Sequence, residues 1–322
     1  MRRALGVAAA RLWVASALGA CALAAAAGAA SPEPIPPSTL QRLLLVDGTR
    51  LGARVVAVGD HGYIAYSDDD GASWRRAAAP AAPLLTALTF VDARHGWAVG
   101  HDALILATAD GGESWTQQFS APSEQRPLLS VAFLTPLSGI AVGAYGAYYE
   151  TFDGGKSWNA RKIIAEDKHF NAIVKLDPAR LLIFGEAGTI LASNDAGKTW
   201  SAVASPYKGS LFGALVADEG AVIAFGMRGR IYRSTDAGKT WKQVENPSAA
   251  TLMGGRKLAD GTLLIVGAAG SALLSRDQGL SFVPLSTGST QVHSTAIPGA
   301  PNAVLLLGEA GARAVPLPLG KR

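Results

Sequence analysis

The sequence contains only one cysteine, Cys21, so the chain has no internal disulfide. A domain of this kind draws its stability from packing alone, even in an oxidising compartment. It also lacks a strong net charge. Three of the 29 basic residues and none of the 25 acidic residues lie in the first thirty positions, which leaves 26 basic and 25 acidic residues in the remainder. This near balance disfavours nucleic-acid binding, which selects for a basic surface.

Several sequence features of enzymes and helical proteins are also missing. No segment after residue 30 shows a sustained helical period. There is no serine or cysteine nucleophile motif, no phosphate loop and no nucleotide fingerprint, so no cofactor is expected. About 290 residues remain after the first thirty, which is enough for one large domain with a substantial core.

The first thirty residues have the layout of a secretory signal peptide. Arg2, Arg3 and Arg11 precede an uncharged run over 12–27, and small residues follow before the Pro-rich stretch that begins at Ser31. The apolar run is short for a membrane span, so we predict a signal peptide over 1–30 and no integral span after its cleavage. The expected location is the periplasm or the medium. Leu-Gly-Ala before Cys21 also permits the alternative of a lipoprotein anchored through Cys21.

An acidic, glycine-bearing octamer recurs along the chain. Its six copies are S67-D-D-D-G-A-S-W74, T108-A-D-G-G-E-S-W115, T151-F-D-G-G-K-S-W158, S193-N-D-A-G-K-T-W200, S234-T-D-A-G-K-T-W241 and S275-R-D-Q-G-L-S-F282. The terminal aromatic residues are 41 to 43 positions apart. Such a fixed period indicates a repeat architecture.

A turn glycine marks the same period seven times. These glycines are Gly59, Gly100, Gly143, Gly185, Gly226, Gly267 and Gly308, and a second glycine follows three positions later except in the second repeat, which has Ala103. Each unit has four short apolar or β-branched runs, in the second repeat over 85–91, 96–99, 104–108 and 115–119. Four strands per unit and seven units predict an all-β fold, a seven-bladed β-propeller of four-stranded antiparallel blades over 40–319, preceded by a Pro-rich segment over 31–39.

Two details of the propeller follow from this period. Thirteen residues before the turn glycine, repeats two to seven have a small residue, as expected where inner strands crowd around an axis; the first repeat departs with Val46. The seventh unit has no octamer. Its fourth strand is therefore missing, or is supplied by the N-terminal segment around Pro34–Ser38, because proline is tolerated on an outermost strand.

The octamer lies between the third and fourth strands of a blade, and its residue types suit a turn. The Asp can accept hydrogen bonds from backbone N–H groups of its own loop, the Gly permits a conformation costly for other residues, and the Trp buries a large ring between sheets. We interpret these residues as structural rather than catalytic or calcium-binding. They are Asp69, Asp110, Asp153, Asp195, Asp236 and Asp277, with Trp74, Trp115, Trp158, Trp200 and Trp241.

The octamer resembles the Asp-box of bacterial neuraminidase repeats, which occurs in sialidases, other glycosidases, sorting receptors and non-enzymatic propellers. The whole unit, as in H95-G-W-A-V-G100 followed by T108-A-D-G-G-E-S-W115, is similar to the photosystem II stability and assembly factor family. That resemblance covers nearly all of residues 40–319. It implies a non-catalytic exported scaffold that binds assembling membrane or envelope proteins, a transporter among the suggested partners. The family's photosynthetic members use an arginine-rich surface, and none of those arginines can be transferred to positions here.

The turns after the seven glycines all fall on one face, opposite the octamers, and form the best candidate binding surface. They present Asp60, His61, His101, Asp102, Tyr145, Glu186, Arg228 and Glu309. Connections between blades add Arg126, residues 167–170 and residues 207–208 to the same face.

Two alternatives use residues of this face. An Asp-box glycoside hydrolase needs two facing carboxylates, which Asp60, Asp102, Glu186 or Glu309 could supply. Its sialidase form would use Arg228, Tyr145 and Glu186, although the remaining arginines lie near the opposite turns. A metal site could form from His61, His101 and their neighbouring aspartates, but separate exposed histidines are more common, so no metal is expected.

Overall fold

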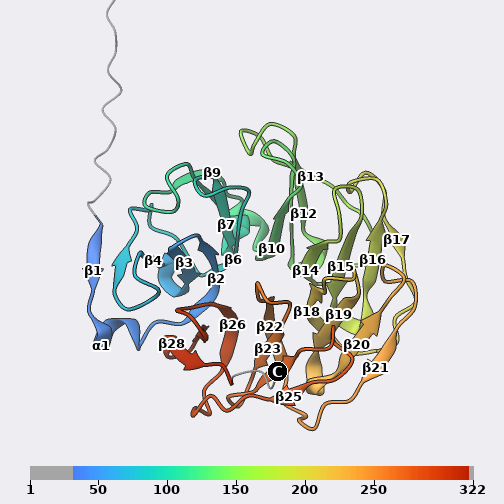
Figure 1. The fold of residues 1–322 in the computed structure, drawn as a ribbon. Coiled ribbons are helices and arrows are strands. Elements are labelled where there is room, and N and C mark those ends of the chain that lie inside the picture. Colours follow the sequence, from blue (N-terminus) through green and yellow to red (C-terminus); the bar gives the residue numbers. More distant parts are fainter. Residues whose placement is uncertain (1–31, 319–322) are drawn as a thin grey trace, which may run out of the picture.

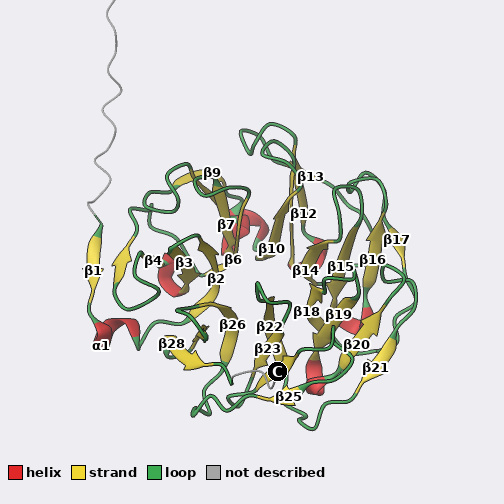
Figure 2. Ribbon diagram, in the orientation of Figure 1, coloured by secondary structure: helices red, strands yellow, loops and turns green. Residues whose placement is uncertain are grey.

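A computed structural model describes residues 32–318, and seven antiparallel sheets in it surround a central axis (Figure 1). The predicted seven-bladed propeller is therefore confirmed. Helix is confined to α1 (Pro37–Leu40) and to single 3-10 turns, while strands and loops make up the blades (Figure 2). No helix among these residues is long and apolar enough to cross a bilayer. The predicted signal peptide and Cys21 lie outside the described residues.

The inner strand of each blade lies next to the axis, and the second strand pairs with it. The inner strands are β2 (Leu45–Leu51), β6 (Leu85–Phe90), β10 (Leu128–Phe133), β14 (Phe170–Lys175), β18 (Leu211–Val216), β22 (Leu252–Lys257) and β26 (His293–Pro298). The second strands are β3 (Arg54–Gly59), β7 (Gly96–Gly100), β11 (Gly139–Gly143), β15 (Leu181–Gly185), β19 (Val222–Gly226), β23 (Leu263–Gly267) and β27 (Ala303–Gly308).

Third and fourth strands complete the blades toward the rim. The third strands are β4 (Ile64–Ser67), β8 (Ile105–Thr108), β12 (Tyr148–Thr151), β16 (Ile190–Ser193), β20 (Ile231–Ser234), β24 (Ala272–Ser275) and β28 (Gly311–Pro316). The fourth strands are β5 (Trp74–Arg76), β9 (Thr116–Phe119), β13 (Asn159–Ala160), β17 (Ser201–Ala202), β21 (Lys242–Val244) and β25 (Val283–Pro284). In the second repeat, the observed bounds differ from the predicted ones by one residue at most.

Apolar packing holds the ring together between blades rather than within them. The buried residues form seven clusters, and each joins two neighbouring blades. The octamer Trp contributes to this packing: Trp115 of the second blade lies in one cluster with Val56, Val58 and Tyr66 of the first. Since every blade buries both faces, the second strands are nearly continuous apolar runs.

The six octamers form one repeated turn. In each copy the Asp carboxylate accepts hydrogen bonds from the N–H and hydroxyl of the seventh residue and from the hydroxyl of the first. The fifth residue is always Gly with positive φ, for example 89° at Gly238. Serine or threonine hydroxyls and one backbone N–H therefore hold the carboxylate, and the turn is fixed by contacts within its own loop.

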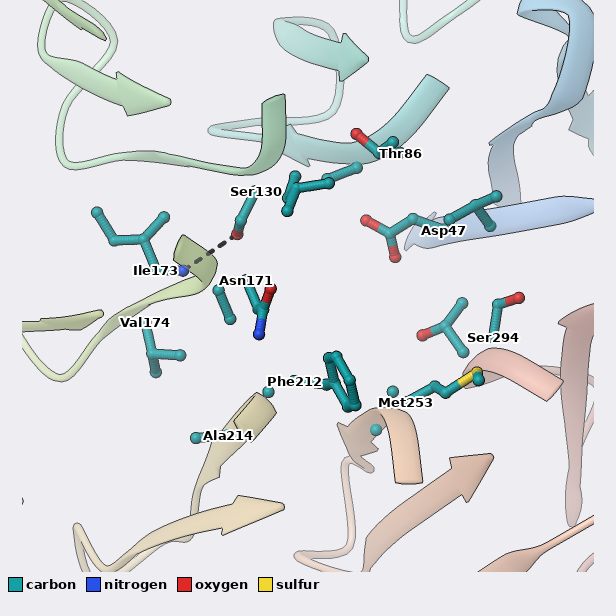
Figure 3. Close-up of a pocket in the computed structure, with 18 of the residues that line it drawn as sticks. Asp47, Thr86, Ser130, Asn171, Ile173, Val174, Phe212, Ala214, Met253 and Ser294 are labelled. Atoms are coloured by element: carbon teal, nitrogen blue, oxygen red, sulfur yellow. Dashed lines mark hydrogen bonds between the residues drawn. The ribbon is translucent and has the colours of Figure 1, made fainter. Parts of the chain in front are cut away.

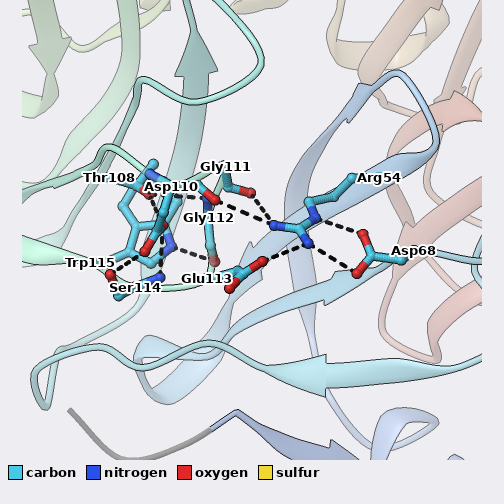
Figure 4. Close-up of polar contacts among 9 residues, drawn as sticks. All are labelled: Arg54, Asp68, Thr108, Asp110, Gly111, Gly112, Glu113, Ser114 and Trp115. Atoms are coloured by element: carbon cyan, nitrogen blue, oxygen red, sulfur yellow. Dashed lines mark hydrogen bonds and ion pairs between the residues drawn. The ribbon is translucent and has the colours of Figure 1, made fainter.

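The octamer of the second blade is also linked to the first blade. Arg54 of β3 donates to both carboxylate oxygens of Asp68, at 2.7 and 3.0 Å, and to Glu113 at 2.8 Å (Figure 4). Its guanidinium lies 4.7 Å from the ring centroid of Tyr66. The side-chain hydrogen bond to Asp68 raises the pKa of Arg54, which therefore stays charged.

In the part of the chain that the structure describes, the seventh blade lacks a fourth strand, which is the first of the two predicted alternatives. The N-terminal strand β1 (Glu33–Ile35) pairs with β5, with Ile35 opposite Trp74, so the first blade has five strands and the seventh has three. The second alternative, in which the segment around Pro34–Ser38 supplies that strand, is wrong. The physical reason is burial: Ile35 and Leu40 pack with Trp74 in the cluster between the first and seventh blades.

The segment between β1 and β2 nevertheless hydrogen-bonds to the turn of the seventh blade. Gly311 N–H donates to the carbonyl of Leu43 at 2.9 Å, as Gly146 N–H of the third blade donates to Lys168 at 2.8 Å. The linkers after the second, third, fourth and sixth blades thus cap the turn of the preceding blade, and residues before β2 do so for the last one. Linker hydrogen bonds and apolar packing close the ring without a shared sheet.

Every inner strand has a β-bulge close to its start. The register shifts between Leu85 and Ala87 in the second blade, for instance, and between Leu45 and Asp47 in the first. Ala87 pairs with Val99, next to the turn glycine, and Asp47 pairs with Val58 in the same way. The equivalent of the small residues is therefore Asp47, not Val46. Counting thirteen residues back from the turn glycine gives Val46 instead of Asp47 because the first blade's hairpin is one residue shorter.

Candidate functional site

The seven turns between second and third strands gather on the face opposite the octamers. In the first six turns the central residue has φ of 50–60°, and His61, Tyr145 and Arg228 among them are exposed. The following residue also has positive φ, even where it is Ala103 at 49°. Two consecutive left-handed residues make these six turns tight and direct the first side chain outward. The turns contact the inner strand of the next blade, so they surround the axis.

The acidic residues predicted on this face are partly engaged in local contacts. Asp60 accepts the His61 N–H at 2.7 Å, and its other oxygen lies 3.0 Å from Nδ1 of His61. Glu186 accepts the N–H of His169 at 3.0 Å, and Glu309 accepts that of Val292 at 3.2 Å. Both glutamates thus bind the end of the linker that enters their own blade.

The aromatic part of the predicted surface lies at the third and fourth blades. Tyr145 is 52% exposed, and its ring meets that of His169 edge to face at 4.8 Å. Arg126 and Lys208 are exposed on the neighbouring linkers. Phe170 was expected on this surface, but it is fully buried as the first residue of β14. Phe170 is structurally equivalent to Leu85 of β6, which is also fully buried, so an aromatic residue at this position belongs to the core.

The histidines of the first two blades do not come together as a metal centre. His61 and His101 are exposed on separate turns. Residues 32–318 contain no group of three or more His, Cys, Asp or Glu side chains arranged to hold an ion. The geometry therefore gives no support to the His/Asp metal alternative.

A cavity of about 530 Å³ lies on the axis, at the end of the inner strands nearest the turns (Figure 3). Sequence reasoning did not single out its lining as a site. The residues that line it at the bulges are Val46, Thr86, Leu129, Asn171, Phe212, Met253 and Ser294. Asp47 provides the one carboxylate of the lining. The sequence does mark the seven bulge residues, because each directly follows the first buried residue of an inner strand.

Asp47 differs from its counterparts in the other blades by its charge. Its carboxylate accepts the N–H of Gly48 at 2.8 Å and that of Leu88, on the neighbouring β6, at 3.0 Å. Burial raises the pKa of Asp47, while the charge of Arg256 and these two hydrogen bonds oppose the rise. The carboxylate is therefore held at a cost beside the axis.

Polar side chains join neighbouring inner strands around part of the cavity. Thr86 donates to the carbonyl of Leu128 at 2.5 Å, and Asn171 donates to that of Leu211 at 2.9 Å. Ser130 accepts the N–H of Ile173 at 3.2 Å (Figure 3). Inner strands have no partner on the axial side, so these contacts satisfy backbone groups that a sheet would otherwise pair.

The family is shown by the match of a family model to most of these repeats. The model described as Photosynthesis system II assembly factor YCF48 matches residues 66–127 and 117–290. The chain belongs to this family. No curated protein matches it in sequence at a significant level.

Solved structures of YCF48 proteins share the fold. A structure described as YCF48 bound to D1 peptide has 19% identity and a TM-score of 0.68, covering 89% of this chain and 97% of its own. YCF48 from Cyanidioschyzon merolae has 16% identity and a TM-score of 0.69, covering 91% and 100%. The GH74 enzyme of Niastella koreensis has 17% identity and a TM-score of 0.65, covering 87% and 44%. At these identities the likeness concerns the fold alone.

Proposed function

We propose that this YCF48-family chain is a non-catalytic, exported scaffold that binds a membrane or envelope protein and assists its assembly or stability. The family match supports this proposal, and the YCF48 structure described with a D1 peptide is a precedent for binding a protein segment. The observation that carries it is the face of tight turns around an axial cavity, which presents exposed side chains on a rigid ring. The amino-terminal residues, with the layout of a signal peptide, support a periplasmic location.

The alternative function is that of a glycoside hydrolase on the same fold. Structural likeness to GH74 enzymes favours it at the level of architecture. Retaining and inverting glycosidases use two carboxyl groups roughly 5 to 9.5 Å apart around the scissile bond. The lining of the axial cavity has a single carboxylate, Asp47, so a scaffold fits this cavity better.

Site-specific photocrosslinking tests the proposal with two aromatic positions on opposite faces. Tyr145 is 52% exposed on the turn face, and Phe152 is 64% exposed in an octamer. A photoreactive phenylalanine analogue at 145 is expected to crosslink a membrane protein in intact cells, and the same analogue at 152 is not. Crosslinks from neither position, together with turnover of a glycoside panel by the purified protein, would replace the scaffold by the hydrolase.

A further inference from the structure

Two neighbouring blades line the axial cavity with apolar residues alone. The stretches Phe212–Ala214 of β18 and Met253–Gly255 of β22 line it without any polar side chain. Met253 is 39% exposed, and the Phe212 ring projects into the cavity from the same side (Figure 3). A Cβ on Gly254 would lie 2.1 Å from the carbonyl of Ser294, so this wall stays free of larger side chains. Phenylalanine and methionine at one mouth form an adaptable apolar contact surface.

Asp47 lines the same cavity from the first blade. Its carboxylate has about four acceptor sites, of which the two backbone N–H groups use two. Among the described residues, no cationic side chain lies within 4.0 Å of it. Arg256, the cation that influences it most, binds the carbonyl of Gly48 at 2.6 Å instead. The carboxylate can therefore still accept a hydrogen bond from a cationic group inside the cavity.

The surrounding turns carry more negative than positive charge. They have the carboxylates of Asp60, Asp102, Glu186 and Glu309 against the guanidiniums of Arg228 and Arg230. The linkers farther from the axis carry both signs, so the excess of carboxylates is confined to the turns. Charge complementarity consequently favours a ligand that is basic close to its point of entry.

We propose that the cavity receives an extended peptide segment in which a large apolar residue and a lysine or arginine lie two positions apart. The apolar side chain packs on Phe212 and Met253, and the cationic group hydrogen-bonds the carboxylate of Asp47. In an extended chain, residues two apart project to the same side about 7 Å from each other, so both enter one cavity. This inference rests on the proposed function and specifies the chemistry of the bound segment.

Binding of fluorescein-labelled heptapeptides to the purified chain tests the chemistry. The probe has the core Phe-Ser-Arg between Ser and Gly residues, and its two controls have the cores Phe-Ser-Glu and Ser-Ser-Arg. Fluorescence anisotropy at low salt is expected to show at least about tenfold weaker binding of each control, and weaker binding of the probe as salt rises. Equal affinity for the arginine and glutamate peptides would overturn the proposal.

Variants assign the effect to the two walls. Asp47→Ser has the residue type found at the equivalent Ser130, so it is expected to fold and to lose most of the arginine-over-glutamate preference. Phe212→Asn has the residue type of the equivalent Asn171 and is expected to weaken the probe about tenfold or more, whereas Phe152→Asn on the opposite face has no effect. An unchanged peptide preference in Asp47→Ser would refute the role of the carboxylate even if Phe212→Asn failed to fold.

The same variants separate this inference from the proposed function. If crosslinking at 145 persists in Asp47→Ser and Phe212→Asn and neither variant changes peptide binding, the scaffold function stands and the cavity is not its peptide site. If the analogue at 145 gives no crosslink in a chain with no other substitution while the peptide preference holds, the scaffold function fails and the cavity's specificity remains.

Discussion

Replacing Asp110 by alanine tests whether the octamer carboxylates are structural. The carboxylate accepts the Ser114 N–H at 3.0 Å, the Ser114 hydroxyl and the Thr108 hydroxyl at 2.8 Å. Thr108 is only 6% exposed, so its hydroxyl would lose an acceptor that water replaces poorly. Hydrogen bonds to charged groups contribute about 1.5–3 kcal/mol each, and partial exposure reduces this value. We expect Asp110→Ala to lower the free energy of unfolding by about 2–4 kcal/mol.

Urea unfolding followed by tryptophan fluorescence measures this loss. Asp110→Asn keeps one carbonyl acceptor in the same place and is expected to lose about half as much. Glu219→Ala is the matched control, because Glu219 is an exposed carboxylate with no hydrogen-bond partner among the described residues, and its removal should change little. Peptide binding at the axial cavity should survive in Asp110→Ala, since the octamers lie on the opposite face.

Two results would refute the structural interpretation of Asp110. One is an alanine variant as stable as the unmodified chain. The other is stabilisation of the unmodified chain by calcium that Asp110→Ala lacks, because a metal ligand and a turn residue differ in this respect. Chelation by EDTA is accordingly expected to leave the unfolding midpoint of both proteins unchanged.

Three further predictions concern pH and the contact between the first two blades. The Thr199 hydroxyl and N–H lower the pKa of Asp195 to about 2. The contribution of the Asp195 carboxylate to stability should therefore be lost as pH falls from about 3.8 through 2, and NMR titration of the carboxyl group measures that pKa. Burial, and to a lesser extent the charge of Arg313, lowers the pKa of His293 below 6.5, so the free energy of unfolding should fall as pH drops below 6.5. Urea unfolding at pH about 7.5 and about 5.5 measures this dependence, which His293→Leu should remove. Arg54→Met should cost about 1–3 kcal/mol in unfolding free energy, and a loss no greater than that of Asp68→Asn would contradict a role in joining the blades.

The prediction for His293 depends on its surroundings. It is 5% exposed at the start of β26, where the second and third blades have Leu85 and Leu128, and its Nε2 has no hydrogen-bond partner among the described residues. Leucine at this position would remove an unsatisfied polar atom. His293→Leu is therefore expected to be at least as stable as the unmodified chain at neutral pH, and a less stable variant would show that the imidazole has a partner.

The period of the sequence predicted most of the fold because each repeat encodes its own blade. The octamer with its carboxylate, glycine and aromatic residue specifies a turn from local contacts, such as those of Asp110 with Thr108 and Ser114. The turn glycines mark the other end of each blade for the same reason. Side chains on those turns, such as Tyr145 and Arg228, could thus be assigned to one face without coordinates.

The axial cavity could not be predicted in this way. Its lining comes from seven inner strands about 40 residues apart, and a register shift at each bulge decides which side chain faces the axis. In the first blade a shorter hairpin places Asp47, not Val46, at the position of the small residues. The pattern of hydrophobic residues does not reveal that one-residue difference, so the carboxylate most relevant to binding was missed.

The sequence by itself determined the number of blades, the octamer turns and the face on which the remaining turns lie, because local hydrogen bonds and strand alternation repeat with the period. Only the tertiary structure decided where β1 docks and which side chains meet at the axis. Burial of Ile35 and Leu40 beside Trp74 places the N-terminal strand on the first blade. Convergence of distant strands places Asp47 in one cavity with Phe212 and Met253. These outcomes depend on packing between blades, which no single repeat specifies.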